Sequence, residues 1–231
     1  MTMYGLLILG LVISLLASWN VNATFRRYQT VSNGRGYTAA QVARQILDQN
    51  GLYQVSIERV SGNLTDHFDP KSNVVRLSDS VYQSTSVAAI GVAAHECGHA
   101  VQHAVGYVPI KVRNAFVPVA QIGSYAWYFI FIAGLIFGLN TSLGNTLAYA
   151  GILLFSAVVL FQVLTLPVEF NASRRALQTL QSNYILDGDE IGKARKVLVA
   201  AAMTYVAAVI GSLLQLLRLL ILSGAFRRND D

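Results

Sequence analysis

Two histidines and one glutamate in a short stretch of the chain have the spacing of a metal site. His95, Glu96 and His99 form the pattern H-E-x-x-H within a run of small and apolar residues. Side chains four positions apart lie on one face of a helix, so both imidazoles can reach one metal ion about 2 Å away. The carboxylate of Glu96 would lie beside that ion, where it can take a proton from water and return it to a leaving amine. The pattern therefore predicts a zinc-dependent hydrolytic site on a helix.

Such a site needs a third protein ligand, because catalytic zinc usually has three and keeps one position open. His103 continues the i, i+4 series, but it would lie about 12 Å from His95 along the helix axis, so we expect it beside the site rather than on the metal. Glu169 is the stronger choice, because it ends a long apolar segment, where a carboxylate is costly unless it is used or solvated. The alternative is a solvated charge that balances Arg174 and Arg175.

A hydrolytic site also needs a donor for the oxyanion besides the metal. The sequence offers four candidates and does not choose among them: His67, His103, Tyr82 and Arg174. A histidine in a polar loop also suits a structural hydrogen bond, for which Asp66 or Asp69 would be the partner of His67.

The motif helix has a plainer interpretation as well. Two histidines four residues apart can simply hydrogen-bond in a packed core without a metal. Cys97, the only cysteine, lies inside the motif, and a single cysteine excludes an intramolecular disulfide and a cysteine-rich zinc site. We interpret Cys97 as a small buried thiol.

The composition indicates a membrane protein. Hydrophobic residues make up 54% of the 231 residues, charged residues only 13%, and the mean hydropathy is +0.46. Charged residues are missing from 1–25, 114–168 and 197–217. A spanning helix needs about 20 apolar residues, and 114–168 is long enough for a hairpin with a break at 138–145. We therefore expect about four transmembrane helices.

The basic residues indicate the orientation of these helices. The first apolar segment lacks a basic start and is followed by Arg26 and Arg27, so it is expected to be a retained anchor with its amino end outside. Residues 26–113 and 169–196 would then be cytoplasmic, although Arg218 and the pair Arg227 and Arg228 follow the last span on the expected outer side. The net charge is +5, and the basic residues lie beside apolar segments rather than in a stripe with interleaved aromatic residues, which argues against nucleic-acid binding.

Local signals predict a small α+β region between the first two spans. Thr38 can cap a helix to about Gln49, and the motif helix would begin after Ser84 or Thr85 and end near Gly106. Strands are expected at 53–60 and 74–77, with a polar loop at 64–73. The strand at 74–77 would be either an edge strand that pairs with an extended substrate or an ordinary core strand.

The predicted fold class is therefore a mainly α membrane protein with a small cytoplasmic α+β region that carries the motif helix. We expect five segments along the chain: an anchor at 1–25, a soluble catalytic region at 26–113, a transmembrane hairpin at 114–168, a cytoplasmic helical segment with the third ligand at 169–196, and a transmembrane helix and tail at 197–231.

Three stretches resemble the YugP-like family of bacterial membrane zinc metallopeptidases: Leu64–Pro70, His95–His103 and Leu166–Ala176. They are more distantly similar to the HtpX-type and CAAX prenyl endopeptidases, which are gluzincins. The resemblance implies a zincin-like region, one zinc ion on His95, His99 and Glu169, and Glu96 as general base. It also implies an integral protein of the bacterial plasma membrane, and the basic residues beside the spans predict that its active site faces the cytoplasm.

One position departs from the related pattern. In HtpX-type enzymes an aspartate usually follows the ligand glutamate by four residues and orients the site, but here that residue is Ser173. The partners that orient the two histidines are therefore unassigned, with Asp66 or Asp69 as substitutes.

The sequence thus favours a membrane-embedded zinc endopeptidase that acts on peptides or on membrane-protein segments. Two other classes of function stay open: a non-catalytic membrane scaffold that keeps zinc for structure, and a partner subunit whose soluble region is a docking module. Glu96 argues against the scaffold, because a structural zinc site has no need of a general base.

Overall fold

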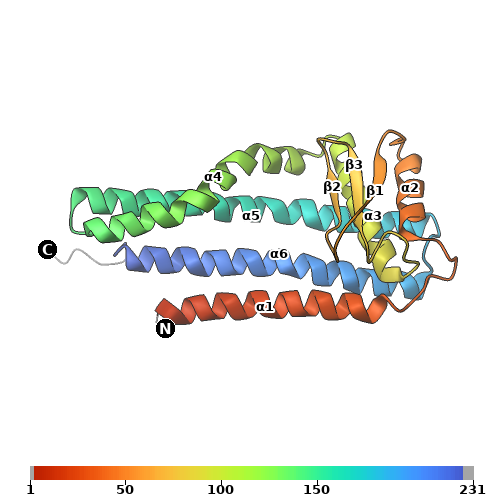
Figure 1. Ribbon diagram of the computed structural model, residues 1–231, viewed down its shortest axis with the longest axis horizontal. Coiled ribbons are helices and arrows are strands. Elements are labelled where there is room, and N and C mark those ends of the chain that lie inside the picture. Colours follow the sequence, from red (N-terminus) through yellow and green to blue (C-terminus); the bar gives the residue numbers. More distant parts are fainter. Residues whose placement is uncertain (1–2, 226–231) are drawn as a thin grey trace. The chain divides into compact units, whose positions relative to one another are not determined.

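The computed structural model describes residues 3–225, and this part of the chain is mainly helical (Figure 1). The predicted tail with Arg227 and Arg228 lies outside the described residues. The elements follow in the order α1 (Met3–Tyr28), α2 (Ala39–Gln49), β1 (Ser56–Val60), β2 (His67–Asp69), β3 (Val74–Ser78), α3 (Val87–Ala104), α4 (Val108–Phe137), α5 (Ser142–Ser182) and α6 (Gly188–Leu222). By length and composition, α1, α4, α5 and α6 could each cross a membrane, which confirms the predicted fold class.

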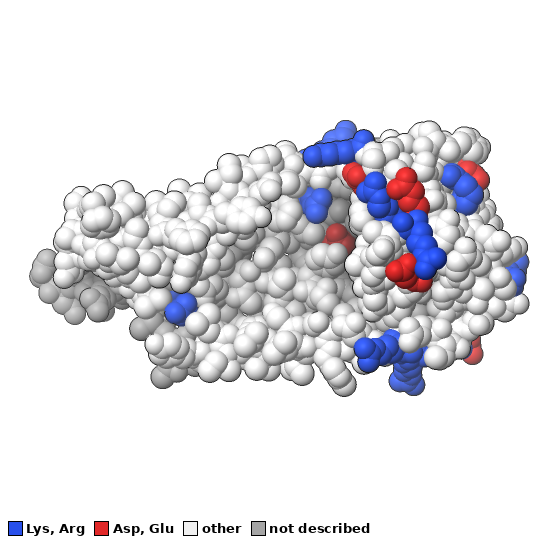
Figure 2. Space-filling model, in the orientation of Figure 1, with Lys and Arg blue, Asp and Glu red and all other residues white. Residues whose placement is uncertain are grey.

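The chain forms two compact units. Unit 1 comprises 1–16, 111–166 and 205–231, and unit 2 comprises 17–110 and 167–204. In the described part of unit 1 the only charged residues are Lys111, Arg113 and Arg218. Large apolar side chains such as Phe129 and Ile136 are exposed there, and Figure 2 shows an almost uncharged face over these helices. Such a surface suits lipid rather than water.

Unit 1 contains the predicted helical hairpin. Helix α4 ends at Phe137 and α5 begins at Ser142, so the break expected at 138–145 is confirmed. Gly138 has a φ of +84°, which favours glycine, and the Thr141 hydroxyl donates to the carbonyl of Phe137 while accepting from the N–H of Gly144. These bonds satisfy backbone groups that the two helix ends leave unpaired.

Helix α5 continues through Pro167 to Ser182, so the second helix of the hairpin expected at 114–168 and the helical segment expected from 169 form one helix. A proline removes one helical hydrogen bond and costs about 3 kcal/mol inside a helix. Beyond it, Val168, Ala172, Ala176 and Leu180 form a stripe of buried side chains with helical spacing. Burial of this stripe favours continuation of the helix and outweighs the local preference of the proline.

In unit 2 a three-stranded sheet packs with α2 and α3 (Figure 1). The strand order is β1-β3-β2, with β1 parallel and β2 antiparallel to β3. Strand β3 is therefore the central strand, and the interpretation of 74–77 as an edge strand is wrong. Strands β1 and β2 pair with both edges of β3, and its residues Val75 and Leu77 are fully buried, as in a core strand. Strand β2 was predicted to be loop, because three residues are too few for an alternating pattern.

Most local signals in unit 2 predicted the elements correctly. Thr38 caps α2 in a reciprocal pair with Gln41, as expected. Helix α3 is capped by Ser86, whose side chain accepts from the N–H of Ala89, and not by Ser84 or Thr85. The neighbouring Ser84 instead donates its hydroxyl to Ser86.

Candidate metal centre

The candidate centre is formed by α3 and the part of α5 that lies in unit 2. The two helices approach closely at Gly98, because a Cβ added there would lie only 2.8 Å from the carbonyl oxygen of Ala172. This approach needs a residue without a side chain. Since Glu169 lies one helical turn before Ala172, the contact at Gly98 brings the Glu169 carboxylate to the two motif histidines.

Three potential ligand atoms meet at this point. The Nε2 atoms of His95 and His99 are 3.1 Å apart, and Oε2 of Glu169 lies 3.3 Å from the first and 3.6 Å from the second. In a tetrahedral zinc site with bonds of 2.0–2.1 Å, neighbouring ligand atoms are about 3.3–3.4 Å apart. The arrangement therefore fits one zinc ion with only small adjustments.

The burial of these groups also favours a cation. Glu169 is 7% exposed, and its Oε2 has no hydrogen-bond partner within residues 3–225. Burial opposes protonation of the His99 ring, but the carboxylates of Glu169 and Glu96 outweigh it and raise the pKa of His99. A buried site with two carboxylates, one of whose oxygens has no hydrogen bond within the described residues, is suited to a bound metal.

Each histidine has a partner on its other ring nitrogen. Nδ1 of His99 lies 3.0 Å from Oε1 of Gln102, which can only accept, so His99 donates from Nδ1 and leaves Nε2 free for a metal. Nδ1 of His95 lies 3.0 Å from Oγ of Ser173. Ser173 lies one helical turn after Glu169, and the hydrogen bond between its hydroxyl and the ring orients His95.

Gln102 also connects α3 to α5. Its side chain is fully buried, and its Nε2 donates to the carbonyl of Val168 at 2.8 Å and to Oδ1 of Asn171 at 3.0 Å. Sequence reasoning missed Gln102 and Asn171. Gln102 could have been recognised as a polar residue three positions after His99, on the same face of an otherwise apolar helix.

Glu96 lies on α3 between the two histidines and is 9% exposed. Its negative charge acts on Asp66, for which burial is the larger cause of a raised pKa. Asp66 accepts from the N–H and the hydroxyl of Ser78, which ties the loop before β2 to the end of β3. Glu96 is therefore positioned at the side of α3 that faces the strands.

Three other residues singled out in the sequence, His103, His67 and Asp69, are not part of the cluster of His95, His99 and Glu169. His103 is exposed, with its ring 6.0 Å from that of Phe68. His67 is exposed and bonds to the carbonyl of Thr65 at 2.9 Å. Asp69 accepts from Arg76 at 3.1 Å.

Thus neither Asp66 nor Asp69 contacts His95 or His99 in the described structure, and Ser173 and Gln102 occupy that place. Cys97 is buried with its thiol directed at the carbonyl of Ala43, so the prediction of a buried thiol is confirmed. Burial raises the pKa of the Cys97 thiol, which keeps it neutral.

Comparisons with known proteins show which family the chain is similar to. A family model described as "Putative neutral zinc metallopeptidase" matches residues 3–224. Over 213 residues, 92% of each chain, the sequence is 46% identical to "Putative membrane protease YugP" of Bacillus subtilis (strain 168). No solved structure matches the chain.

Proposed function

Because the chain belongs to the family described as "Putative neutral zinc metallopeptidase", we propose that it is a membrane-embedded zinc endopeptidase of the gluzincin type. The membership confirms the resemblance to the YugP-like family. The proposed enzyme hydrolyses peptide bonds in proteins or in membrane-protein segments close to the bilayer surface.

The observation that supports this function most strongly is the buried meeting of three ligand atoms from two helices. His95 and His99 on α3 and Glu169 on α5 place these atoms 3.1–3.6 Å apart, and Oε2 of Glu169 has no hydrogen-bond partner within the described residues. Since histidine nitrogen and carboxylate oxygen are ordinary zinc donors, we propose that these three residues hold one zinc ion. Three protein ligands leave one tetrahedral position open for water or substrate.

The chemistry follows from the residues around that position. When bound, zinc supplies Lewis acidity, which polarises a peptide carbonyl and lowers the pKa of water toward about 7. Glu96 accepts a proton from the attacking water and transfers it to the leaving amine. Gln102 holds His99 in the tautomer that leaves Nε2 free, and Ser173 orients the ring of His95 through its hydroxyl.

An extended substrate can be held by the sheet. Strand β2 pairs only with β3 among the described strands, so one side of it is free for another strand. It packs near α3, which carries Glu96. We therefore propose β2, and not the central β3, as the strand that pairs with the substrate backbone.

The distribution of charge supports a cytoplasmic site in a bacterial plasma membrane. Arg26 and Arg27 end α1, and Arg174 and Arg175 follow the proposed ligand on α5, all in unit 2. Basic residues next to spanning segments favour the cytoplasmic side. Figure 2 shows further charges of both signs gathered over the strands. In this sheet Arg76 forms ion pairs with Glu58 and Asp69.

The test compares the full-length wild type with Glu96→Gln and with Glu58→Gln as a matched control on the exposed strand β1. Each purified protein is assayed in detergent for zinc stoichiometry and for cleavage of an unfolded protein. We expect one zinc in all three and cleavage in the wild type and the control only. If all three proteins bind zinc and none cleaves, the proposed peptidase activity is refuted and a scaffold is favoured. If Glu96→Gln cleaves as well as the wild type, the role of Glu96 as general base is refuted.

A further inference from the structure

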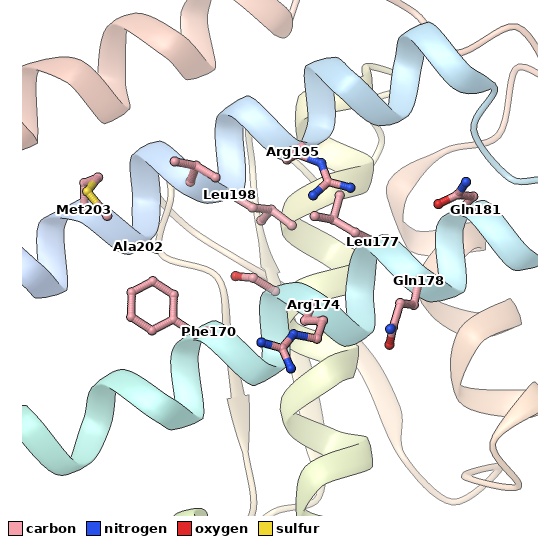
Figure 3. Close-up of a pocket in the computed structure, with 11 residues that line it drawn as sticks. Phe170, Arg174, Leu177, Gln178, Gln181, Arg195, Leu198, Ala202 and Met203 are labelled. Carbon is pink, nitrogen blue, oxygen red and sulfur yellow. The ribbon is translucent and has the colours of Figure 1, made fainter.

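A pocket of about 350 Å³ lies between α5 and α6 within unit 2 (Figure 3). Its polar walls include Arg174 and Gln178 from α5 and Arg195 from α6. The rest of its lining is mostly apolar, with Phe170 from α5 and Leu198 from α6. Pockets of this size with a few placed polar groups are typical of ligand sites.

The pocket adjoins the candidate metal centre. Ser173 lines it, and the same hydroxyl lies 3.0 Å from Nδ1 of His95. Phe170, another lining residue, directly follows Glu169 in the chain. A molecule in this pocket would therefore lie next to residues that carry and orient the metal ligands.

Two arginines line the pocket, Arg174 from α5 and Arg195 from α6. Figure 3 shows the Arg195 side chain directed toward α5 and the Arg174 side chain beside α5. Neither side chain makes a hydrogen bond or an ion pair with any residue in 3–225, and the lining contains no aspartate or glutamate. By contrast, the adjacent Arg175 donates to Asn171 at 2.8 Å. Two unpaired guanidinium groups beside one cavity favour an anion, and most of all a carboxylate, which fits their planar geometry.

The remaining lining narrows the choice of anion. Gln178 and Gln181 offer neutral donors and acceptors that suit peptide groups, while Leu177, Leu198 and Met203 suit an apolar side chain. A phospholipid phosphate would also neutralise the two arginines. A lipid site, however, does not require the side-chain amides of Gln178 and Gln181 or a position next to Ser173. The combined chemistry is that of a peptide with a carboxylate beside an apolar residue.

We propose that this cavity, the Arg174–Arg195 pocket, binds a carboxylate of the peptide substrate together with a neighbouring apolar side chain. The assignment of the ligand as substrate rests on the proposed peptidase function. The carboxylate is either a glutamate or aspartate side chain or the free carboxyl terminus, and both offer the same group to the two arginines. Peptides that carry such a group close to the scissile bond are then the preferred substrate class.

The test measures binding without turnover, using the zinc-loaded full-length Glu96→Gln protein and fluorescence anisotropy. The probes are three fluorescein-labelled hexapeptides of one apolar sequence: one with a free carboxyl terminus, one amidated, and one amidated with a single glutamate. We expect at least one carboxylate peptide to bind about tenfold more tightly than the neutral peptide, as a charge-assisted hydrogen bond allows. Tighter binding of the first locates the preference at the terminus, and tighter binding of the third at the side chain.

Added substitutions connect the preference to the pocket. In Arg174→Gln/Arg195→Gln the ratio between the carboxylate and neutral peptides should fall to about 1, whereas Arg174→Lys/Arg195→Lys should keep part of it. Arg35→Gln, which removes an exposed arginine elsewhere in unit 2, should leave the ratio unchanged. Equal binding of all three peptides before substitution, or a preference that survives the double glutamine variant, overturns the proposal. Binding of phosphatidylglycerol micelles that depends on the two arginines, with equal peptide binding, overturns it in favour of a lipid site.

The outcome is separable from that of the proposed function. If the wild type cleaves protein but all three peptides bind equally, only the Arg174–Arg195 pocket is refuted. If the wild type cleaves nothing while the arginine-dependent preference is present, the peptidase is refuted and the pocket remains a site for peptide carboxylates.

Discussion

Replacing Gly98 with alanine tests how the two helices of the candidate metal centre are held together. Gly98 occupies a variable position of the H-E-x-x-H motif and makes no contact with the proposed metal. Its added Cβ would lie 2.8 Å from the carbonyl oxygen of Ala172 and 3.2 Å from its Cα. Both atoms belong to the backbone of α5, so no flexible side chain can move aside.

The size of the effect follows from these distances. Ordinary contacts begin near 3.5 Å, so α3 and α5 must separate by about 0.7 Å. Overpacking of this kind costs about 1–3 kcal/mol, offset in part by the better helix propensity of alanine, about 1 kcal/mol. Glu169 lies one turn from Ala172 and would move with α5. Because metal bonds tolerate only about 0.2 Å, we expect zinc affinity to fall by about 10- to 100-fold.

The assay is a chelator competition for zinc, together with thermal unfolding of the zinc-free, full-length protein. Gly91→Ala is the matched control, because it lies on the same helix and its Cβ would meet Ala194 at an ordinary 3.5 Å. The control should keep its zinc affinity and gain up to about 1 kcal/mol of stability. The reasoning is refuted if Gly98→Ala binds zinc as tightly as Gly91→Ala.

Three further predictions concern the support of the site and its orientation. Ser173→Ala, which removes the partner of the first motif histidine, should lower zinc affinity about tenfold in the same competition, and an unchanged affinity would contradict that role. Asp66→Ala leaves a buried backbone N–H at the end of β3 without its acceptor, so the free energy of unfolding should fall by about 1–3 kcal/mol, measured as a lower midpoint of thermal unfolding. An unchanged midpoint would show that this hydrogen bond does not contribute to stability. Since Cys97 is buried and neutral, a membrane-impermeant maleimide should label Asn140→Cys only from outside and Asn183→Cys only from the cytoplasm, and the reverse pattern would refute the proposed orientation.

Local patterns were sufficient to predict most elements of the fold. The charge-free runs indicated the spanning helices, and the glycine and asparagine residues at 138–145 indicated the hairpin turn. Thr38 marked the start of α2 because its side chain caps the very helix that it precedes. These signals are short in range, so they can be recognised without knowing what each element packs against.

The errors arose where packing between distant segments decides the structure. Helix α5 continues through Pro167 because its next turns are buried, and no local rule reports that burial. The central position of β3 depends on β2, whose three residues pair with it across a turn. The same limit applied to the site: Gln102 and Ser173 became visible as partners of the histidines only after α3 and α5 were placed side by side.

The central claim is that zinc is held by ligands from two helices, with Glu169 as the third and Glu96 outside the ligand set. The most direct measurement is the zinc affinity of full-length Glu169→Gln and Glu96→Gln, determined side by side by chelator competition. We predict that Glu169→Gln binds zinc at least about 100-fold more weakly than the wild type, because a charged ligand is lost, while Glu96→Gln stays within a few-fold of it. Equal zinc affinities for the two variants would contradict the claim.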